Sequence, residues 1–185
     1  MLLLGGCHRT PEHLAVEDDL AGETWGLLDA DSAAVTFPTA YAGRPLLVSA
    51  IYTHCPDVCP MTMANVERVR DLLGADTTRV QFVTVSFDPA RDTPTVLRSY
   101  ARAWGIGNGW SLLTGDTTAI SGLMGRLGIN TERGERDTLA TGEVTYDVSH
   151  TDKLLLLDPE GRIVETYGGS AAPPEMVAAD VRALF

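Results

Sequence analysis

The sequence predicts an α/β domain in which helices flank a central mixed sheet. Three observations predict it: strand-length apolar runs alternate with segments of helical periodicity, a hairpin pattern stands near the C-terminus, and two cysteines follow the first core strand. Strands separated by helices pair in parallel, whereas a hairpin adds antiparallel strands. A chain of 185 residues with 44% hydrophobic residues can bury a sizeable core as one domain.

The predicted strands are short apolar runs bounded by turn residues. Residues 46–52 form a continuous apolar run, a pattern typical of a strand buried on both faces. Residues 79–87 predict a second buried strand, and residues 110–113 predict a third strand. Segments 154–157 and 162–167 flank the sequence DPEG, whose residues favour a tight turn, and therefore predict a hairpin. Shorter apolar runs between residues 25 and 39 predict a small N-terminal hairpin.

Four helices are predicted from apolar residues that recur three and four positions apart. Three of them begin at Pro60, Pro94 and Pro174, since proline suits a first helical turn, and Asp116 could cap the fourth. Their predicted inner faces carry Met63, Val66, Val69, Leu73, Leu97, Tyr100, Ala101, Trp104, Ile120, Leu123, Met124, Leu127, Val177, Val181, Leu184 and Phe185.

Cys55 and Cys59 stand between the first core strand and its helix. A disulfide across so short a loop would stabilise the fold little, so a chemical role is favoured over a structural one. The N-terminus of a helix stabilises a thiolate, and we expect both thiols to ionise readily there. Thiols four residues apart on a helix share a face, so they can bind a metal or form a disulfide. This placement predicts a thioredoxin-like fold, extended by the N-terminal hairpin and by residues 128–144.

Two sequence blocks resemble the Sco (SenC-type) family of copper proteins. The first is YTHCPDVCP at residues 52–60, and the second is VSFDPARDTP at residues 85–94. A histidine far downstream, His150, matches the family's third metal ligand by position. The similarity extends from about Trp25 to the C-terminus.

The resemblance implies a thioredoxin-like domain that binds copper through Cys55, Cys59 and His150. It also implies delivery of that copper to the binuclear centre of cytochrome c oxidase, whose copper-centre subunit would be the partner. Another periplasmic copper chaperone or a thiol reductant would be a further partner, since thiol reduction is a debated second role. The family usually carries an aspartate before the histidine, and Ser149 stands there instead.

The residue types agree with copper on chemical grounds. Two thiolates and an imidazole suit the soft, low-coordinate Cu(I) ion, and Cu(II) could occupy the same ligands. Structural zinc would require a fourth ligand, and His54 is a weak candidate because its side chain could point away. Asp57 and Asp88 could support the ligands from outside the coordination shell. For Asp88, as for Asp92 in the same segment, loop structure and helix capping are the simpler interpretation.

Alternative functions remain open from the sequence. A thiol–disulfide oxidoreductase would use Cys55 and Cys59 as its catalytic pair, one to attack and the other to resolve the mixed disulfide, but would leave His150 without a required role. A thiol peroxidase would need only one reactive cysteine. A purely structural role for the cysteines predicts effects on stability alone.

Charge and the N-terminus bear on location and partners. The chain has 14 Lys+Arg against 25 Asp+Glu, which argues against binding to nucleic acid or through a polybasic membrane patch. Residues 1–7, MLLLGGC, resemble the end of a bacterial lipoprotein signal with Cys7 as the lipidated residue. We therefore expect residues 1–20 to be a tether and 21–185 the copper-binding domain. The expected location is the periplasmic side of the bacterial inner membrane.

Overall fold

The computed structural model describes residues 12–20, 22–138 and 144–185. Its largest sheet has eight strands in the order β1-β12-β11-β4-β5-β6-β2-β3. In that order the strands are Asp18–Asp19, Arg162–Gly168, Lys153–Leu157, Leu46–Ile51, Gln81–Ser86, Trp110–Thr114, Trp25–Asp29 and Ala34–Phe37.

The sheet is mixed, as predicted. β4, β5 and β6 are parallel neighbours, and the antiparallel hairpin of β11 and β12 joins them through β4. On the other side, the predicted N-terminal hairpin of β2 and β3 pairs with β6. β4 therefore lies between a parallel and an antiparallel neighbour at the centre of the fold.

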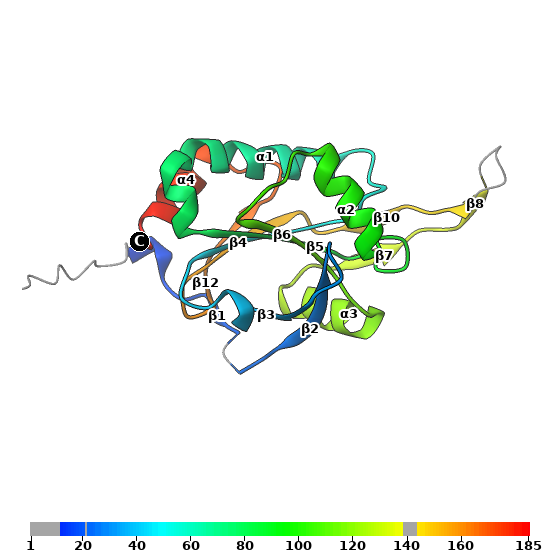
Figure 1. Ribbon diagram of the computed structural model, residues 1–185, viewed down its shortest axis with the longest axis horizontal. Helices are drawn as coiled ribbons and strands as arrows, with labels where there is room; N and C mark the ends of the chain where they lie inside the picture. The colour runs from blue at the N-terminus through cyan, green and yellow to red at the C-terminus, as the bar shows by residue number, and fades with distance from the viewer. Residues whose placement is uncertain (1–11, 21, 139–143) are drawn as a thin grey trace, which may run out of the picture.

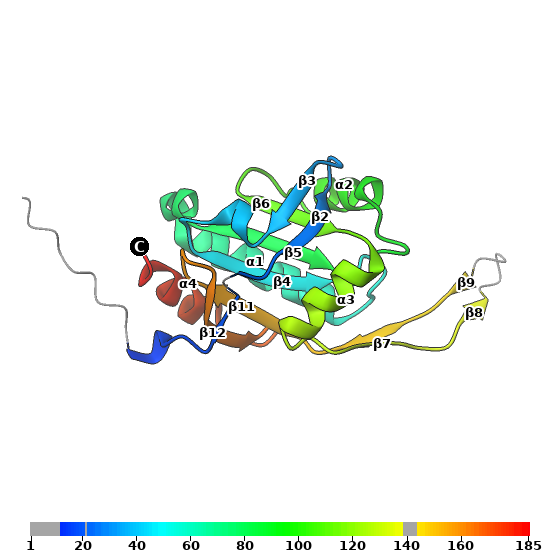
Figure 2. The ribbon, with the colours of Figure 1, turned by 90° about the horizontal axis from the view of Figure 1, so that it is seen from below.

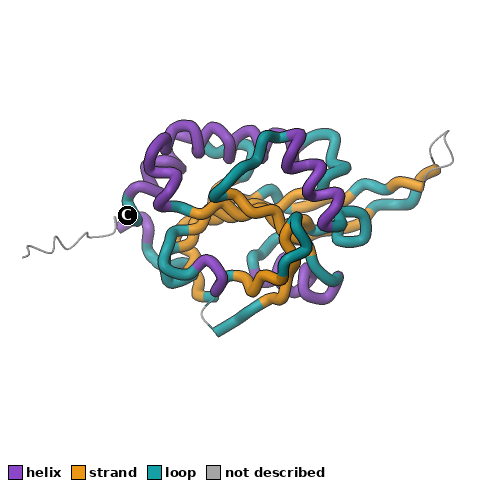
Figure 3. Tube along the Cα trace, viewed as in Figure 1, coloured by secondary structure: helices purple, strands orange, loops and turns teal. Residues whose placement is uncertain are grey.

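Helices cover both faces of this sheet. Helices α1 (Val58–Leu73), α2 (Pro94–Ala103) and α4 (Pro174–Arg182) lie on one face, and α3 (Thr117–Arg126) lies on the other (Figures 1 and 3). Asp116 caps α3 as predicted, and its carboxylate accepts from the N–H groups of Thr118 and Ala119, both at 2.9 Å. Three short 3-10 helices complete the helical elements of the described residues, at Glu12–Leu14, Thr39–Tyr41 and Gly74–Arg79.

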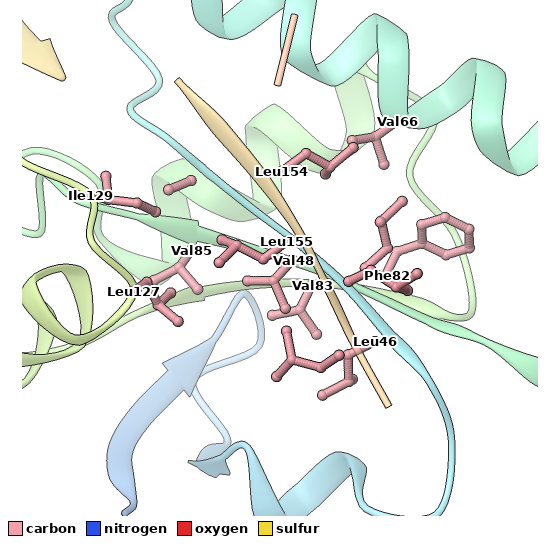
Figure 4. Packing of buried hydrophobic residues seen from close by; sticks show 14 of the residues in the cluster. Leu46, Val48, Val66, Phe82, Val83, Val85, Leu127, Ile129, Leu154 and Leu155 are labelled. Carbon is pink, nitrogen blue, oxygen red and sulfur yellow. The ribbon is translucent and has the colours of Figure 1, made fainter. Parts of the chain in front are cut away.

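The core lies on both sides of the central strands. Every residue of β4 and β5 is buried, which confirms the two predicted buried strands. Figure 4 shows Leu154 of β11 beside Val66 of α1, and Val85 of β5 near Leu127 and Ile129, which follow α3. Two buried hydroxyls on β4 and β5, of Ser49 and Thr84, bond one another at 2.8 Å, so each has a hydrogen-bond partner inside the core.

A ribbon of short strands projects from the body of the domain. β7 (Thr131–Arg133) pairs with β10 (Val148–His150), and farther out β8 (Asp137–Thr138) pairs with β9 (Val144–Thr145). We call the described residues 131–138 and 144–150 the arm; Figure 2 shows it extending away from the sheet. The sequence predicted extra length in this region but no strands.

Part of the segment expected to be a tail packs on the domain instead. Leu14 and Leu20 are buried, at 2% and 0% exposed, and β1 adds a strand to the edge of β12. On the other side, Arg126 of α3 forms ion pairs with Asp18 and Glu23. The sequence did not predict that this segment packs on the domain, because Leu14 and Leu20 are isolated apolar residues among polar and acidic ones. Cys7 lies outside the described residues, and the tether stays a prediction.

The described residues contain no helix that is both long and apolar enough to cross a membrane.

We expect Leu20→Ala to lower the free energy of unfolding by about 2–5 kcal/mol, the usual cost of a cavity in a packed core. Val16→Ala is the matched control: Val16 lies in the same segment but is 49% exposed, so its loss should change stability by about 0.5 kcal/mol or less. Urea denaturation followed by circular dichroism measures both. Equal, small effects would mean that this segment does not belong to the folded unit.

Candidate metal centre

The two cysteines lie where β4 passes into α1. After β4 ends at Ile51, the Cys55 N–H donates to the Tyr52 carbonyl at 3.2 Å and closes a turn. Helix α1 begins at Val58, so Cys59 lies in its first turn, and its N–H points at the Cys55 sulfur at 3.4 Å. Asp57 is exposed and occupies the N-cap position, where its side chain makes no capping hydrogen bond to the described residues.

The two thiols differ in their surroundings. Cys55 is partly exposed, whereas Cys59 is 1% exposed. Burial raises the pKa of the Cys59 thiol far above its usual range, and the neighbouring Cys55 raises it further. The expectation that both thiols ionise readily is therefore wrong for Cys59, because desolvation outweighs the favourable helix terminus. A cation that replaces the proton would remove this penalty.

His150 approaches the cysteines from the arm. It is the last residue of β10, and its Nε2 lies 3.5 Å from the Cys59 sulfur. Its Nδ1 lies 3.2 Å from the Thr151 carbonyl, and because a carbonyl only accepts, we assign the proton to Nδ1. The lone pair of Nε2 then faces the sulfur. The ring also packs against Phe87, with 4.6 Å between centroids.

The structure brings together three of the residues predicted from the sequence. The ligand atoms of Cys55, Cys59 and His150 all lie within 4.8 Å of one another, and no other group of three or more His, Cys, Asp or Glu in the described residues is so placed. His54 is exposed and faces elsewhere, with Nδ1 3.1 Å from the Thr53 hydroxyl and 3.8 Å from Asp92. The arrangement is a set of two sulfurs and one nitrogen.

Asp92 holds the turn that leads to the cysteines. It is fully buried, and its two oxygens accept from the Thr53 N–H at 2.9 Å, the Thr53 hydroxyl at 2.5 Å and the Ser86 hydroxyl at 2.5 Å. Thr93, rather than Asp92, caps α2. The sequence indicated a loop and cap here, but it could not show that the Asp92 side chain turns inward, since the donors come from two other segments.

Asp88 anchors the arm. This buried carboxylate forms an ion pair with Arg91 and accepts from the Tyr146 hydroxyl at 2.7 Å. Arg133 of β7 lies 3.7 Å away, and the Arg91 guanidinium lies over the Tyr146 ring at 3.6 Å. These contacts of Asp88 join it to the arm rather than to Cys55, Cys59 or His150, so it supports the base of the element that carries the histidine.

Tyr52 links the cysteine loop to the same element. Its hydroxyl accepts from the Val148 N–H at 3.3 Å, and its ring packs against Phe87 at 5.4 Å between centroids. Ser149, which stands where the resembling family usually carries aspartate, donates to the Glu132 carbonyl of β7 at 3.3 Å. This hydrogen bond therefore links the two strands of the arm, β10 and β7.

The family model for SCO1/SenC matches residues 15–185 of this chain. The chain belongs to the SCO1/SenC family. The resemblance to the Sco family that the two sequence blocks indicated is confirmed, and so is the predicted thioredoxin-like fold.

Individual relatives agree. A Stutzerimonas stutzeri protein, named provisionally as copper-binding, is 36% identical over 60% of this chain and 52% of its own length. The human mitochondrial protein SCO1 homolog is 27% identical over 75% of this chain and 44% of its own length. The chain thus spans about half the length of these curated relatives. Among solved structures, ScoI of Bradyrhizobium japonicum with copper bound has a TM-score of 0.73 and 29% identity, covering 88% of this chain and 98% of that one.

We expect Asp92→Ala to lower the free energy of unfolding by at least about 2 kcal/mol, because it leaves three donors without their acceptor, two of them on Thr53. Asp57→Ala is the control, since this exposed aspartate makes no capping bond to the described residues, and its effect should stay within about 0.5 kcal/mol. Denaturant unfolding of both variants measures the difference. A cost for Asp92→Ala no larger than that for Asp57→Ala would contradict this role.

Proposed function

We propose that this protein is a copper carrier that holds Cu(I) between the thiolates of Cys55 and Cys59 and the Nε2 of His150. The observation that carries the proposal is the convergence of these three ligand atoms within 4.8 Å. Family membership supports it, as does a relative of known structure described with copper bound.

The donor set fits copper. Two soft sulfurs with one imidazole favour Cu(I), whose low coordination number three ligands satisfy, whereas structural zinc requires a fourth. The proton on Nδ1 of His150 leaves Nε2 free to bind the metal. Burial of Cys59 adds selectivity, because only a cation that binds thiolate strongly can displace a proton from a desolvated sulfur. Cu(II) could occupy the same ligands.

Copper would leave by ligand exchange. The partly exposed Cys55 gives an incoming thiolate access to the metal from the solvent side. Each acceptor thiol loses a proton as it binds copper, and each protein thiolate takes up a proton as it releases copper, so protons and charge balance without a redox step. We propose the copper-centre subunit of cytochrome c oxidase as the acceptor, as family membership suggests, and an extracytoplasmic copper chaperone as a donor.

We further propose an extracytoplasmic location. A relative from Bacillus anthracis is described as a SCO1/SenC family lipoprotein, which agrees with the expected lipidation of Cys7. Mass spectrometry of the membrane-extracted native protein would detect an acyl group on Cys7, and an unmodified Cys7 would contradict the tether.

Anaerobic titration of the reduced protein with Cu(I) against a competing chelator tests the carrier. We expect one tight equivalent, weakened at least about tenfold (about 1.4 kcal/mol) by His150→Ala and abolished by the Cys55→Ser/Cys59→Ser double variant. His54→Ala is the matched control, since this neighbouring histidine faces Thr53 and Asp92, and it should bind copper like the wild type. A His150→Ala protein with wild-type affinity would place the third ligand elsewhere, and no tight copper at all would overturn the proposal.

A second function is favoured by one observation: a partly exposed thiol stands beside a buried one. In thiol–disulfide exchange, the Cys55 thiolate would attack a target disulfide and release one target thiolate. Cys59 would then attack the Cys55 sulfur, release the second target thiol and leave a Cys55–Cys59 disulfide. The target gains two electrons and the protein loses two.

The reduction rate of a peptide disulfide by the metal-free protein separates the two functions. If the protein is mainly a reductase, His150→Ala keeps the wild-type rate while Cys55→Ser abolishes it. If it is mainly a carrier, we expect slow reduction by the wild type, because Cys59 is buried with a raised pKa and resolves the mixed disulfide poorly.

A further inference from the structure

Asp152 links the segment that follows His150 to helix α1. Its Oδ1 accepts a hydrogen bond from the Thr62 hydroxyl at 2.9 Å. Thr62 stands three residues after Cys59 on α1, so about one helical turn separates this bond from the cysteine. The second oxygen, Oδ2, accepts from the Ser170 N–H at 2.7 Å and from the Ser170 hydroxyl at 2.6 Å. The carboxylate therefore joins three segments of the chain.

The chain at Gly169 closes tightly over this carboxylate. A Cβ at Gly169 would lie 2.2 Å from the Asp152 Oδ1 and 3.1 Å from the Thr62 Cγ2, so any larger residue must displace one of them. The neighbouring Gly168 has room, since a Cβ there would meet only the Ala171 Cβ at 3.7 Å. Asn65 of α1 fixes the same loop, with its Nδ2 2.8 Å from the Gly169 carbonyl.

Few contacts set the distance between His150 and α1. In the part of the chain that the structure describes, two hydrogen bonds join residues 150–152 to α1: His150 with Cys59, and Asp152 with Thr62. The hydrogen bond between His150 and Cys59 joins two of the proposed ligands, so it would be lost when both direct their lone pairs to a metal. The second involves no proposed ligand, so metal binding does not require it to break. The Phe87 ring and the Thr151 carbonyl orient the imidazole plane but do not reach α1.

We propose that Asp152 is a positioning residue that holds His150 Nε2 at the cysteine pair, so that copper receives a nitrogen ligand as well as two sulfurs. This inference rests on the proposed copper site and deepens it. Neither block that resembles the family contains Asp152, and without its carboxylate the arm would carry His150 with no hydrogen bond to α1 other than that to Cys59.

Four variants test it in the full chain: Asp152→Ala removes the carboxylate, Gly169→Ala displaces it, Gly168→Ala is the matched control, and Asp152→Asn keeps its shape. With its oxygen toward Ser170, the Asn amide can donate to the Thr62 hydroxyl oxygen, whose own proton then bonds the Val58 carbonyl 3.1 Å away, so this variant keeps a link to α1. We measure Cu(I) affinity by chelator competition and the nitrogen coupling of bound Cu(II) by electron paramagnetic resonance. We expect Asp152→Ala to lose about 10–100-fold in affinity, as is usual for groups that orient metal ligands, and to lose nitrogen coupling. Gly169→Ala should shift in the same direction, while Asp152→Asn and Gly168→Ala should match the wild type.

A double-mutant cycle separates positioning from general stability. If Asp152 acts through His150, Asp152→Ala should change copper affinity little in a His150→Ala background. An equal loss in that background, or wild-type affinity and nitrogen coupling in Asp152→Ala itself, would overturn the inference while leaving the carrier intact. Should Asp152→Ala fail to fold, the comparison of Gly169→Ala with Gly168→Ala decides, and equal behaviour of those two overturns it. A wild-type protein that binds no copper would overturn the proposed function and this inference with it.

Discussion

The candidate metal centre depends on the antiparallel pairing of β11 with β4. Leu154 near the start of β11 lies opposite Ser49 near the end of β4, and Leu157 lies opposite Leu46. The cysteines follow the carboxyl end of β4, while His150 precedes β11, so this register brings both to the same edge of the sheet. His150 and Cys59 are 91 positions apart in the chain, yet their ligand atoms lie 3.5 Å apart.

Three carboxylates, of which Asp88 and Asp92 are buried and Asp152 is partly exposed, fix segments that the sheet aligns only coarsely. Asp92 binds donors on the cysteine turn, Asp88 binds side chains of the arm, and Asp152 binds α1 and the loop before α4. Burying a carboxylate is costly unless hydrogen bonds or ion pairs replace its water. Each of the three is satisfied by donors from at least two segments, so each fixes those segments relative to one another near the edge where the cysteines and histidine meet.

The two sulfurs are chemically unequal because one is buried. Desolvation raises the pKa of Cys59, whereas Cys55 remains partly open to solvent. A buried thiol keeps its proton until a strongly thiolate-binding cation replaces it, and an accessible neighbour lets ligands exchange. This asymmetry suits both a carrier and an exchange reaction, and the role of His150 is what distinguishes them.

Local sequence patterns were enough to predict the mixed α/β sheet, the four helices, both hairpins and the family, because apolar periodicity and the CPDVC block are properties of adjacent residues. Cys55 and Cys59 follow from the same local signals, while His150 depended on resemblance alone. The packing of Leu14 and Leu20, the strands of the arm and the inward turn of Asp92 had no such signal. The contacts of Asp152 and the raised pKa of Cys59 likewise come only from the tertiary structure. Each of these depends on burial or on hydrogen bonds with distant segments, and only the folded chain brings those segments together.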